Sequence, residues 1–232
     1  YNSNGTYASE TWANGTTNTE LATLAEAMEG ASVDVGYAPV NQFSYASKSF
    51  LATGQGTAMF SIVLKTDGTK MYLMDRTNVI IYQYSLSTAY DVSTASYDSV
   101  SFSVTTQENS PYGITASADG TKFYVIGEAN DTVYQYTLST AWDLSTASYA
   151  SKSFSVAAQE LTPTSLQFKP DGTKVYVAGR SSDTVYQYTL STAWDISTAS
   201  YDSKSLVVSS QSLYPLGIAL NSDGTKLYVD DL

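Results

Sequence analysis

"DGTKVYVAGRSSDTVYQYTLSTAWDISTASY", residues 171–201, is one of several near-identical stretches that recur along the chain at a constant interval. Its opening motif, DGTK, begins at four positions that are 52 residues apart: Asp67, Asp119, Asp171 and Asp223. The motif YQY and the segment STAxDxSTAS follow with the same spacing in the first three copies. A fixed interval held over four copies indicates a repeat architecture in which each copy forms one structural unit.

Four short strands are predicted in each copy. In the third copy the strands are predicted at residues 164–169, 174–179, 184–190 and 201–208. Asp171 and Gly172 form a strong hairpin signal between the first two of these strands. Apolar and aromatic residues stand at both odd and even positions, which indicates sheets that are buried on both faces. Four antiparallel strands in a period of about 40 to 50 residues are typical of a β-propeller blade.

The order of the strands predicts an all-β propeller with four blades of 52 residues. A fourth set of strands begins near Pro215 and contains only its inner and second strands before Leu232. Residues 31–38 and 44–50 can supply the missing third and outer strands, which would close the ring without an open sheet edge. An excerpt from a longer ring or array is the alternative.

The predicted organisation is an N-terminal extension over residues 1–30 and a propeller over residues 31–232. The extension carries a short predicted helix, with Thr17 and Glu20 placed as a capping box and Gly30 as its C-cap. An amphipathic helix of this kind suits a lid on the ring and a tether to a larger assembly equally well.

The composition excludes several functions. A net charge of −11 argues against nucleic acid and against anionic membrane surfaces, and no apolar run reaches the length of a membrane span. Histidine and cysteine are absent, which removes the usual serine triad, most zinc sites and disulfide bonds. The predicted inner strands carry no Asp or Glu, so neither a metal site nor a cofactor is predicted.

The recurring Asp residues of the DGTK hairpin and of the AWDxSTAS connection are predicted to serve turns, because Asp accepts hydrogen bonds from nearby backbone groups. The aromatic residue of that connection is expected to cap the outer edge of a blade, with stacking on sugars as the alternative. It is Tyr90, Trp142 or Trp194.

Differences between the copies concentrate in two loops, which propeller geometry places on the same face. One loop joins the second strand to the third, and the other precedes each inner strand. A constant face and a varied face suggest a scaffold on one side and recognition on the other, although unconstrained loops also drift freely. The candidate binding residues are Arg76, Glu108, Glu128, Glu160, Arg180, Leu213 and Tyr214.

The repeat DGTKxYV…DTVYQYxLSTAWDxSTASY, over residues 44–232, resembles tandem propeller repeats of marine bacteria and their phages. It is more distantly similar to the YVTN-type propellers of surface-layer proteins. The resemblance implies a propeller in an extracellular or virion setting, and it implies no catalytic residues.

The predicted function is therefore a non-enzymatic structural and recognition module on a virion or cell surface, which binds a glycan or protein receptor through the varied face. Its predicted partners are other subunits of a viral or surface assembly. One alternative is a purely architectural protein that decorates or cements a capsid, tail or filament through the constant face. The other is a polysaccharide-active enzyme.

Overall fold

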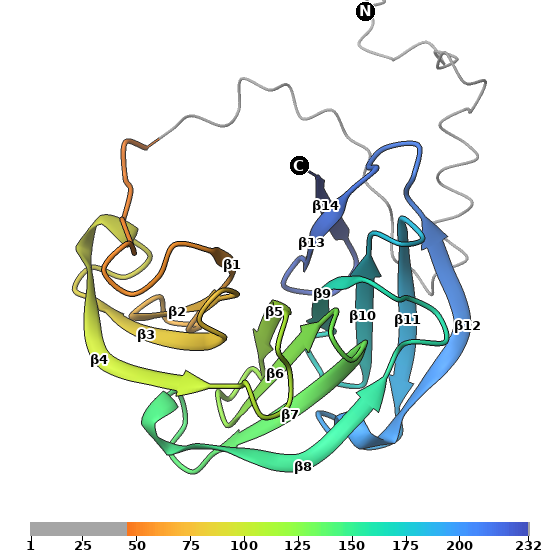
Figure 1. Ribbon diagram of the computed structural model, residues 1–232, viewed down its shortest axis with the longest axis horizontal. Helices are drawn as coiled ribbons and strands as arrows, with labels where there is room; N and C mark the ends of the chain where they lie inside the picture. The colour runs from red at the N-terminus through yellow and green to blue at the C-terminus, as the bar shows by residue number, and fades with distance from the viewer. Residues whose placement is uncertain (1–45, 232) are drawn as a thin grey trace, which may run out of the picture.

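The computed structural model describes residues 46–231 as successive antiparallel sheets arranged as propeller blades around a common centre (Figure 1). Each complete sheet has four strands in chain order, from the innermost strand to the outermost. Blade 1 contains β1 (Met59–Leu64), β2 (Lys70–Asp75), β3 (Ile80–Leu86) and β4 (Ala95–Ser103). Blade 2 contains β5 (Pro111–Ala116), β6 (Lys122–Gly127), β7 (Thr132–Leu138) and β8 (Ala147–Ser155). Blade 3 contains β9 (Pro163–Phe168), β10 (Lys174–Gly179), β11 (Thr184–Leu190) and β12 (Ala199–Val207).

A two-stranded sheet, β13 (Pro215–Leu220) and β14 (Leu227–Asp231), follows blade 3 as the inner half of a further blade. The all-β propeller architecture is thus confirmed, with three complete blades and one half-blade in the part of the chain that the structure describes. Residues 46–50, the described part of the predicted outer strand at 44–50, carry no strand. The strand predicted at 31–38 and the predicted N-terminal helix lie outside the described residues.

The hairpin between the inner and second strands forms for the reason that its sequence predicts. In blade 3, Gly172 has φ 72°, a left-handed conformation that glycine adopts without strain. The Asp171 carboxylate accepts hydrogen bonds from Thr173 N at 2.9 Å and from Thr173 Oγ1 at 2.6 Å. The Asp residue therefore serves the turn, as predicted.

A single 3-10 turn lies between the third and outer strands of each complete blade: η2 (Val92–Thr94), η3 (Leu144–Thr146) or η4 (Ile196–Thr198). Asp143 caps η3 by accepting a hydrogen bond from Ser145 N at 3.0 Å. The preceding Trp142 has φ 62°, and its ring lies directly over the hairpin glycine Gly120. The prediction that these aromatic rings cap the outer edge of the blade was wrong, because they cover the hairpin instead.

The core lies between neighbouring blades. Four consecutive residues of β6, from Phe123 to Ile126, are at most 1% exposed, so side chains on both faces of the strand are buried. Phe123 packs with Tyr72 of blade 1, and Tyr124 packs with Phe168 of blade 3. Burial on both faces accounts for the run of apolar residues without alternation.

Across residues 46–231 the structure contains no helix of the length and apolar character that crossing a membrane requires.

Candidate functional site

The loops gather on two opposite faces of the blades. On one face the 3-10 connection reaches back to the hairpin of its own blade, where Trp142 N donates to Gly120 O at 2.9 Å. On the other face the loop after the second strand meets the loop that precedes the inner strand, where Glu128 N donates to Ser110 O at 3.2 Å. The two variable loops of each blade therefore do lie together, and we call their side of the molecule the variable face.

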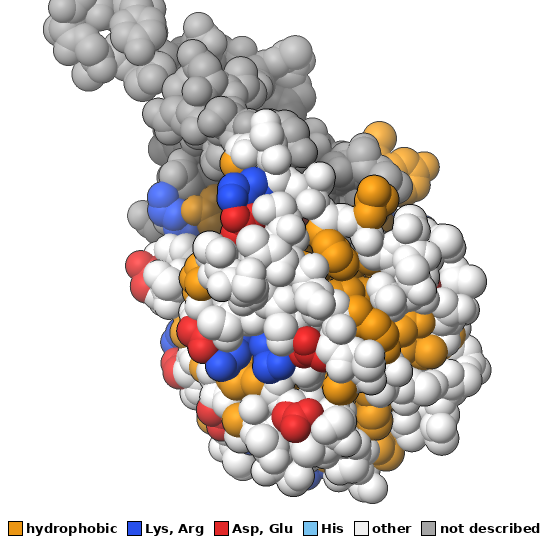
Figure 2. Space-filling view, turned by 90° about the vertical axis from the view of Figure 1, so that its left-hand side faces the viewer, with side chains coloured by type: hydrophobic (Ala, Val, Ile, Leu, Met, Phe, Trp, Pro, Cys, Tyr) orange, Lys and Arg blue, Asp and Glu red, His pale blue; other side chains and the backbone are white. Residues whose placement is uncertain are grey.

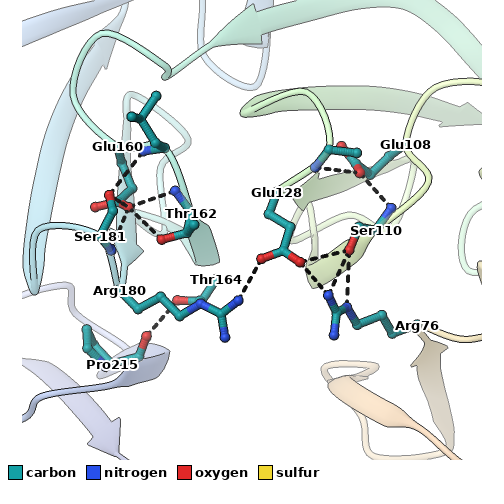
Figure 3. A network of polar contacts seen from close by, with 12 residues as sticks. Arg76, Glu108, Ser110, Glu128, Glu160, Thr162, Thr164, Arg180, Ser181 and Pro215 are labelled. Atoms are coloured by element: carbon teal, nitrogen blue, oxygen red, sulfur yellow. Dashed lines mark hydrogen bonds and ion pairs between the residues drawn. The ribbon is translucent and has the colours of Figure 1, made fainter.

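Three charged side chains meet on the variable face, and each is the first residue after the second strand of its blade. Glu128 of blade 2 lies between Arg76 of blade 1 and Arg180 of blade 3 (Figure 3). One Glu128 oxygen pairs with Arg76 Nη2, and the other accepts from Arg180 Nη2 at 2.7 Å. The sequence predicted all three as candidate contacts, and the structure brings them together.

Two residues that the sequence analysis missed hold this group in place. Ser110 Oγ accepts from Arg76 Nη2 at 2.9 Å and donates to Glu128 Oε1 at 3.2 Å. The ring of Tyr112 lies beneath both guanidinium groups, with its centroid 4.2 Å from Arg76 Cζ and 5.1 Å from Arg180 Cζ. Cation–π contact with a buried ring stabilises two neighbouring positive charges.

The site has unused hydrogen-bond donors. Nη1 of Arg76, together with Nε and Nη1 of Arg180, makes no hydrogen bond or ion pair within residues 46–231. About a third of each arginine side chain is exposed. Two guanidinium groups around one carboxylate leave a net positive charge, which favours an anionic ligand. In the described part of the chain no cluster of three His, Cys, Asp or Glu side chains could hold a metal ion.

Glu108 and Glu160, predicted as binding contacts, are instead fully buried within the loops. Glu160 Oε1 accepts from Thr162 N at 2.9 Å and from Ser181 N at 3.0 Å, so it satisfies backbone groups that would otherwise be buried without partners (Figure 3). Glu108 plays the same role in blade 2, where Oε1 accepts from Ser110 N at 2.8 Å and Oε2 has no partner within residues 46–231. These two predictions were wrong because the carboxylates point into the protein.

The two buried carboxyls differ in acidity. Burial raises the pKa of Glu108, and its backbone hydrogen bonds only partly oppose this effect. Burial acts in the same direction on Glu160, but hydrogen bonds from the hydroxyls of Ser181 and Ser182 outweigh it and lower its pKa. The loop of blade 2 has Ala129 and Asn130 in place of those serines, which explains the difference.

The last two predicted contacts, Leu213 and Tyr214, lie in the loop before β13. Their side chains are 62% and 57% exposed, as a surface contact requires.

Two small hollows lie between the inner strands and border the hairpins and 3-10 connections, away from the charged group. Their volumes are about 230 and 250 Å³. Trp142 borders the first and Trp194 the second, and Gln167 is common to both. Neither of these two hollows is lined by an Asp, Glu, Lys or Arg side chain.

Sheets of this order, arranged as blades, define a β-propeller. The sequence profile of the family described as "Lactonase, 7-bladed beta-propeller" matches residues 52–231, which is well over half of the chain. The chain therefore belongs to this lactonase family. The seven blades of the family description exceed the predicted four, so the comparison does not support the predicted blade count.

Solved structures share the fold at low sequence identity. A protein from Lactobacillus plantarum has a TM-score of 0.55 and 16% identity, over 75% of this chain and 48% of that one. Two Bacteroides proteins provisionally described as 6-phosphogluconolactonases each have a TM-score of 0.53 over 74% of this chain. The protein from Bacteroides uniformis shows 14% identity over 46% of its own chain, and that from Bacteroides fragilis shows 16% over 47%. The chain thus spans about half the length of these structures. A search of curated protein sequences found no match.

The family corrects the functional prediction. A non-enzymatic virion or receptor-binding module was predicted from the absence of histidine and the lack of acids on the inner strands, whereas the matched family is one of lactonases. The absence of histidine and of acids on the inner strands therefore does not exclude an enzyme in this family. The prediction that the chain is not an enzyme is contradicted by the same family match.

Proposed function

We propose that this protein hydrolyses a lactone at the group formed by Arg76, Glu128 and Arg180. Membership of the lactonase family supports the reaction class. The observation that carries the proposed location is the pair of arginines with unused donors, held side by side over Tyr112. Because the chain spans about half the length of the solved structures, the activity is a proposal for this chain and not a property carried over from them.

Lactone hydrolysis develops negative charge on the carbonyl oxygen, which two arginines can stabilise. Water adds to the carbonyl carbon and gives a tetrahedral intermediate with a negative oxygen, and the ring C–O bond then breaks. The products are a carboxylate and a hydroxyl group, and one proton passes to solvent. A guanidinium donates hydrogen bonds to the developing oxyanion and then to the product carboxylate, which lowers the barrier to the first step.

Glu128 acts in this scheme as a positioning residue. It holds Arg76 and Arg180 on either side of its carboxylate through its two oxygens, with both guanidinium groups over Tyr112. Ser110 fixes the Arg76 side of the arrangement. Donors that are fixed before the substrate arrives do not have to reorganise during the reaction.

A lactonase assay on the purified chain tests the proposal. Proton release from 6-phosphogluconolactone and from an unphosphorylated sugar lactone is followed at constant pH, with spontaneous hydrolysis subtracted. Arg180→Ala should lower kcat/KM roughly 100-fold, which is the usual effect of removing one oxyanion donor. Lys65→Ala, which removes a positive charge on the opposite face, serves as the matched control. Hydrolysis no faster than the spontaneous rate for both lactones, or equal activity of Arg180→Ala and the wild type, would refute the proposed site.

We propose that the propeller has four blades, which is supported by the four DGTK copies at a constant spacing of 52 residues. An extracellular or cell-surface location is likewise proposed, and fractionation of cells that produce the chain would test it. The predicted partners, subunits of a larger assembly or a glycan or protein receptor, stay a prediction.

A further inference from the structure

The outer strand of each complete blade carries the same bulge. Two successive residues of that strand stand outside the pairing register: 98–99 in β4, 150–151 in β8 and 202–203 in β12. The second residue of each pair is a serine, with φ of 58°, 56° or 57°. A bulge of this kind turns the side chains that it carries in a defined direction. The backbone therefore presents residues 98, 150 and 202 in the same way.

In blade 1 the bulge carries an aspartate that is held by donors from the second and third strands. Asp98 Oδ2 accepts a hydrogen bond from Gln83 Nε2 at 2.8 Å and pairs with Lys70 Nζ at 3.0 Å. Lys70 Nζ also donates to Ser85 Oγ at 3.4 Å. One carboxylate oxygen thus lies among a lysine, an amide and a hydroxyl group.

Blade 3 repeats this arrangement. Asp202 Oδ2 accepts from Gln187 Nε2 at 2.7 Å and from Thr189 Oγ1 at 2.8 Å, and Lys174 Nζ lies 3.5 Å away. Burial raises the pKa of Asp98 and of Asp202, but the hydrogen bonds outweigh burial and lower the pKa of both. The lysine, the glutamine and the hydroxyl group therefore form a carboxylate cradle, which stabilises the negatively charged form.

Blade 2 has the carboxylate cradle without the carboxylate. Lys122, Gln135 and Thr137 stand at the positions of the three donors, but residue 150 is alanine. Gln135 is 2% exposed, and within residues 46–231 its Nε2 donates no hydrogen bond. Its Oε1 accepts from Ile196 N at 3.0 Å, which turns Nε2 toward Ala150, as the equivalent glutamine of blade 1 turns toward its aspartate. A buried amide donor of this kind calls for an acceptor.

The lysine of the blade 2 cradle also lacks the partner that its equivalents have. Figure 2 shows that Lys and Arg side chains on one side of the molecule mostly lie beside Asp or Glu side chains. Within residues 46–231 Lys122 forms no ion pair, and its Nζ donates only to Thr121 Oγ1 at 3.4 Å. Asp119, which interacts with Lys122 at longer range, already accepts hydrogen bonds from Ser117 and Thr121. The positive charge of Lys122 is thus available to an anion.

The donors of blade 2 can be reached from solvent. Thr137 is exposed, whereas Ser85 and Thr189 at the same position of blades 1 and 3 are half-buried. The carboxylate that covers the hydroxyl group in those blades is replaced by the methyl group of Ala150. A small molecule can therefore approach the cradle along the path that an aspartate side chain fills elsewhere.

We propose that blade 2 binds the carboxylate of a small external molecule beside Ala150, with Lys122, Gln135 and Thr137 as its donors. One oxygen of the ligand accepts from Gln135 Nε2 and Thr137 Oγ1, and its charge is neutralised by Lys122. The rest of the molecule projects into solvent. Lys122 is the first residue of β6 and Glu128 follows the last, so the site is separate from the arginine pair and independent of lactone hydrolysis.

A monocarboxylate fits this cradle better than other anions. The same three types of donor already hold a planar carboxylate in blades 1 and 3. A dianion such as phosphate would bring a second negative charge to a partly buried place where one lysine offers the only positive charge of the cradle, and an unmatched charge is costly there.

Binding should also strengthen the contact between blades 2 and 3. Gln135 receives Ile196 N of blade 3 on its oxygen and would hold the ligand with its nitrogen, so both ends of one amide are fixed. Hydrogen bonds that share an amide polarise one another. A ligand that binds only the folded chain raises its stability, so the urea midpoint of unfolding should rise with the concentration of the ligand.

NMR titration of the 15N-labelled full chain with sodium formate tests the site directly. Formate is the probe because it is a carboxylate with no further group, and the total ionic strength is held constant with sodium chloride. The side-chain NH2 signals of Gln135 should move to higher proton frequency and saturate. Those of Gln83 and Gln187, whose amides already donate to aspartates, should stay in place and serve as internal controls.

Two variants define the donors and the space. Ala150→Asp supplies the missing carboxylate, so the Gln135 signals should no longer respond to formate and formate should no longer raise the urea midpoint. Lys122→Met should weaken the affinity for formate at least about tenfold, because it removes the charged donor. Lys65→Met, which breaks an ion pair on an exposed turn, is the matched control and should bind formate as the wild type does.

The converse variant asks whether the cradle itself binds formate. Asp98→Ala should create a second site, so that the Gln83 signals respond to formate as those of Gln135 do. The proposal is overturned if the wild-type Gln135 signals show no saturable shift, or if Ala150→Asp responds to formate as the wild type does. Equal shifts when formate is replaced by more chloride would overturn the assignment of a carboxylate. None of these readouts depends on lactonase activity.

Discussion

Glu160→Ala is expected to destabilise the protein strongly, although the residue was predicted as a surface contact. The substitution leaves Thr162 N and Ser181 N without their acceptor inside a closed loop. An unsatisfied buried donor costs about 1 to 3 kcal/mol, so two of them should lower the free energy of unfolding by about 2 to 6 kcal/mol. Glu160→Gln keeps one oxygen for these donors and should cost less, about 1 to 2 kcal/mol.

Urea unfolding at neutral pH, followed by tryptophan fluorescence, measures this loss. Leu161→Ala is the matched control, because the neighbouring side chain is 61% exposed and should change stability by no more than about 0.5 kcal/mol. The pKa of Glu160 is lowered in the folded protein, so its contribution is complete above the unfolded pKa of about 4.3 and is lost as the pH falls. A Glu160→Ala effect below about 1 kcal/mol, or one that does not shrink in acid, would refute the capping role.

Three further changes test the fold. Gly120→Ala should lower the free energy of unfolding by about 1 to 3 kcal/mol and alter tryptophan fluorescence, because residue 120 has φ 69° and the new Cβ would lie 2.2 Å from the Trp142 ring. Gly54→Ala, with open space around it, should be nearly neutral in the same urea titration. Tyr72→Phe removes a buried hydrogen bond between blades and should lower the unfolding free energy by about 0.5 to 1.5 kcal/mol, and no change in the urea midpoint would count against that contact. Burial opposes ionisation of Asp202, but hydrogen bonds from Gln187 and Thr189 outweigh it and lower its pKa. The free energy of unfolding should therefore fall as the pH drops below about 4. The free energy of unfolding of Asp202→Asn should vary less with pH over that range, as urea midpoints at several pH values would show.

The strands could be predicted closely because the repeat supplies several copies of each signal. The strands predicted at 174–179 and 184–190 coincide with β10 and β11. The outer strand β12 begins at Ala199, two residues before the predicted start, because the 3-10 turn ends there and its backbone is already extended. Local turn chemistry and hydrophobic pattern agree in this protein, which makes such predictions reliable.

The site could be predicted only in part, because the sequence of one repeat does not show which of its residues contact the neighbouring blades. Arg76, Glu128 and Arg180 were found from their variation, but their meeting depends on the stacking of blades. The burial of Glu108 and Glu160 had a signal that was overlooked. Each faces a glycine at the end of the second strand, whereas in blade 1 the loop residue is Gly56 and the carboxylate comes from Asp75 of that strand. One carboxylate per blade in a shared space indicates a structural role.

The alternation of charge along Arg76, Glu128 and Arg180 limits how this protein can change its length. Repeat proteins gain and lose units by duplication or deletion, and near-identical copies are the usual starting point for such events. Here the duplication of any one of the three blades would place two like charges side by side at a partly desolvated contact. Insertion of a neighbouring pair of blades preserves the alternation. Single copies are thus interchangeable in shape and not in charge.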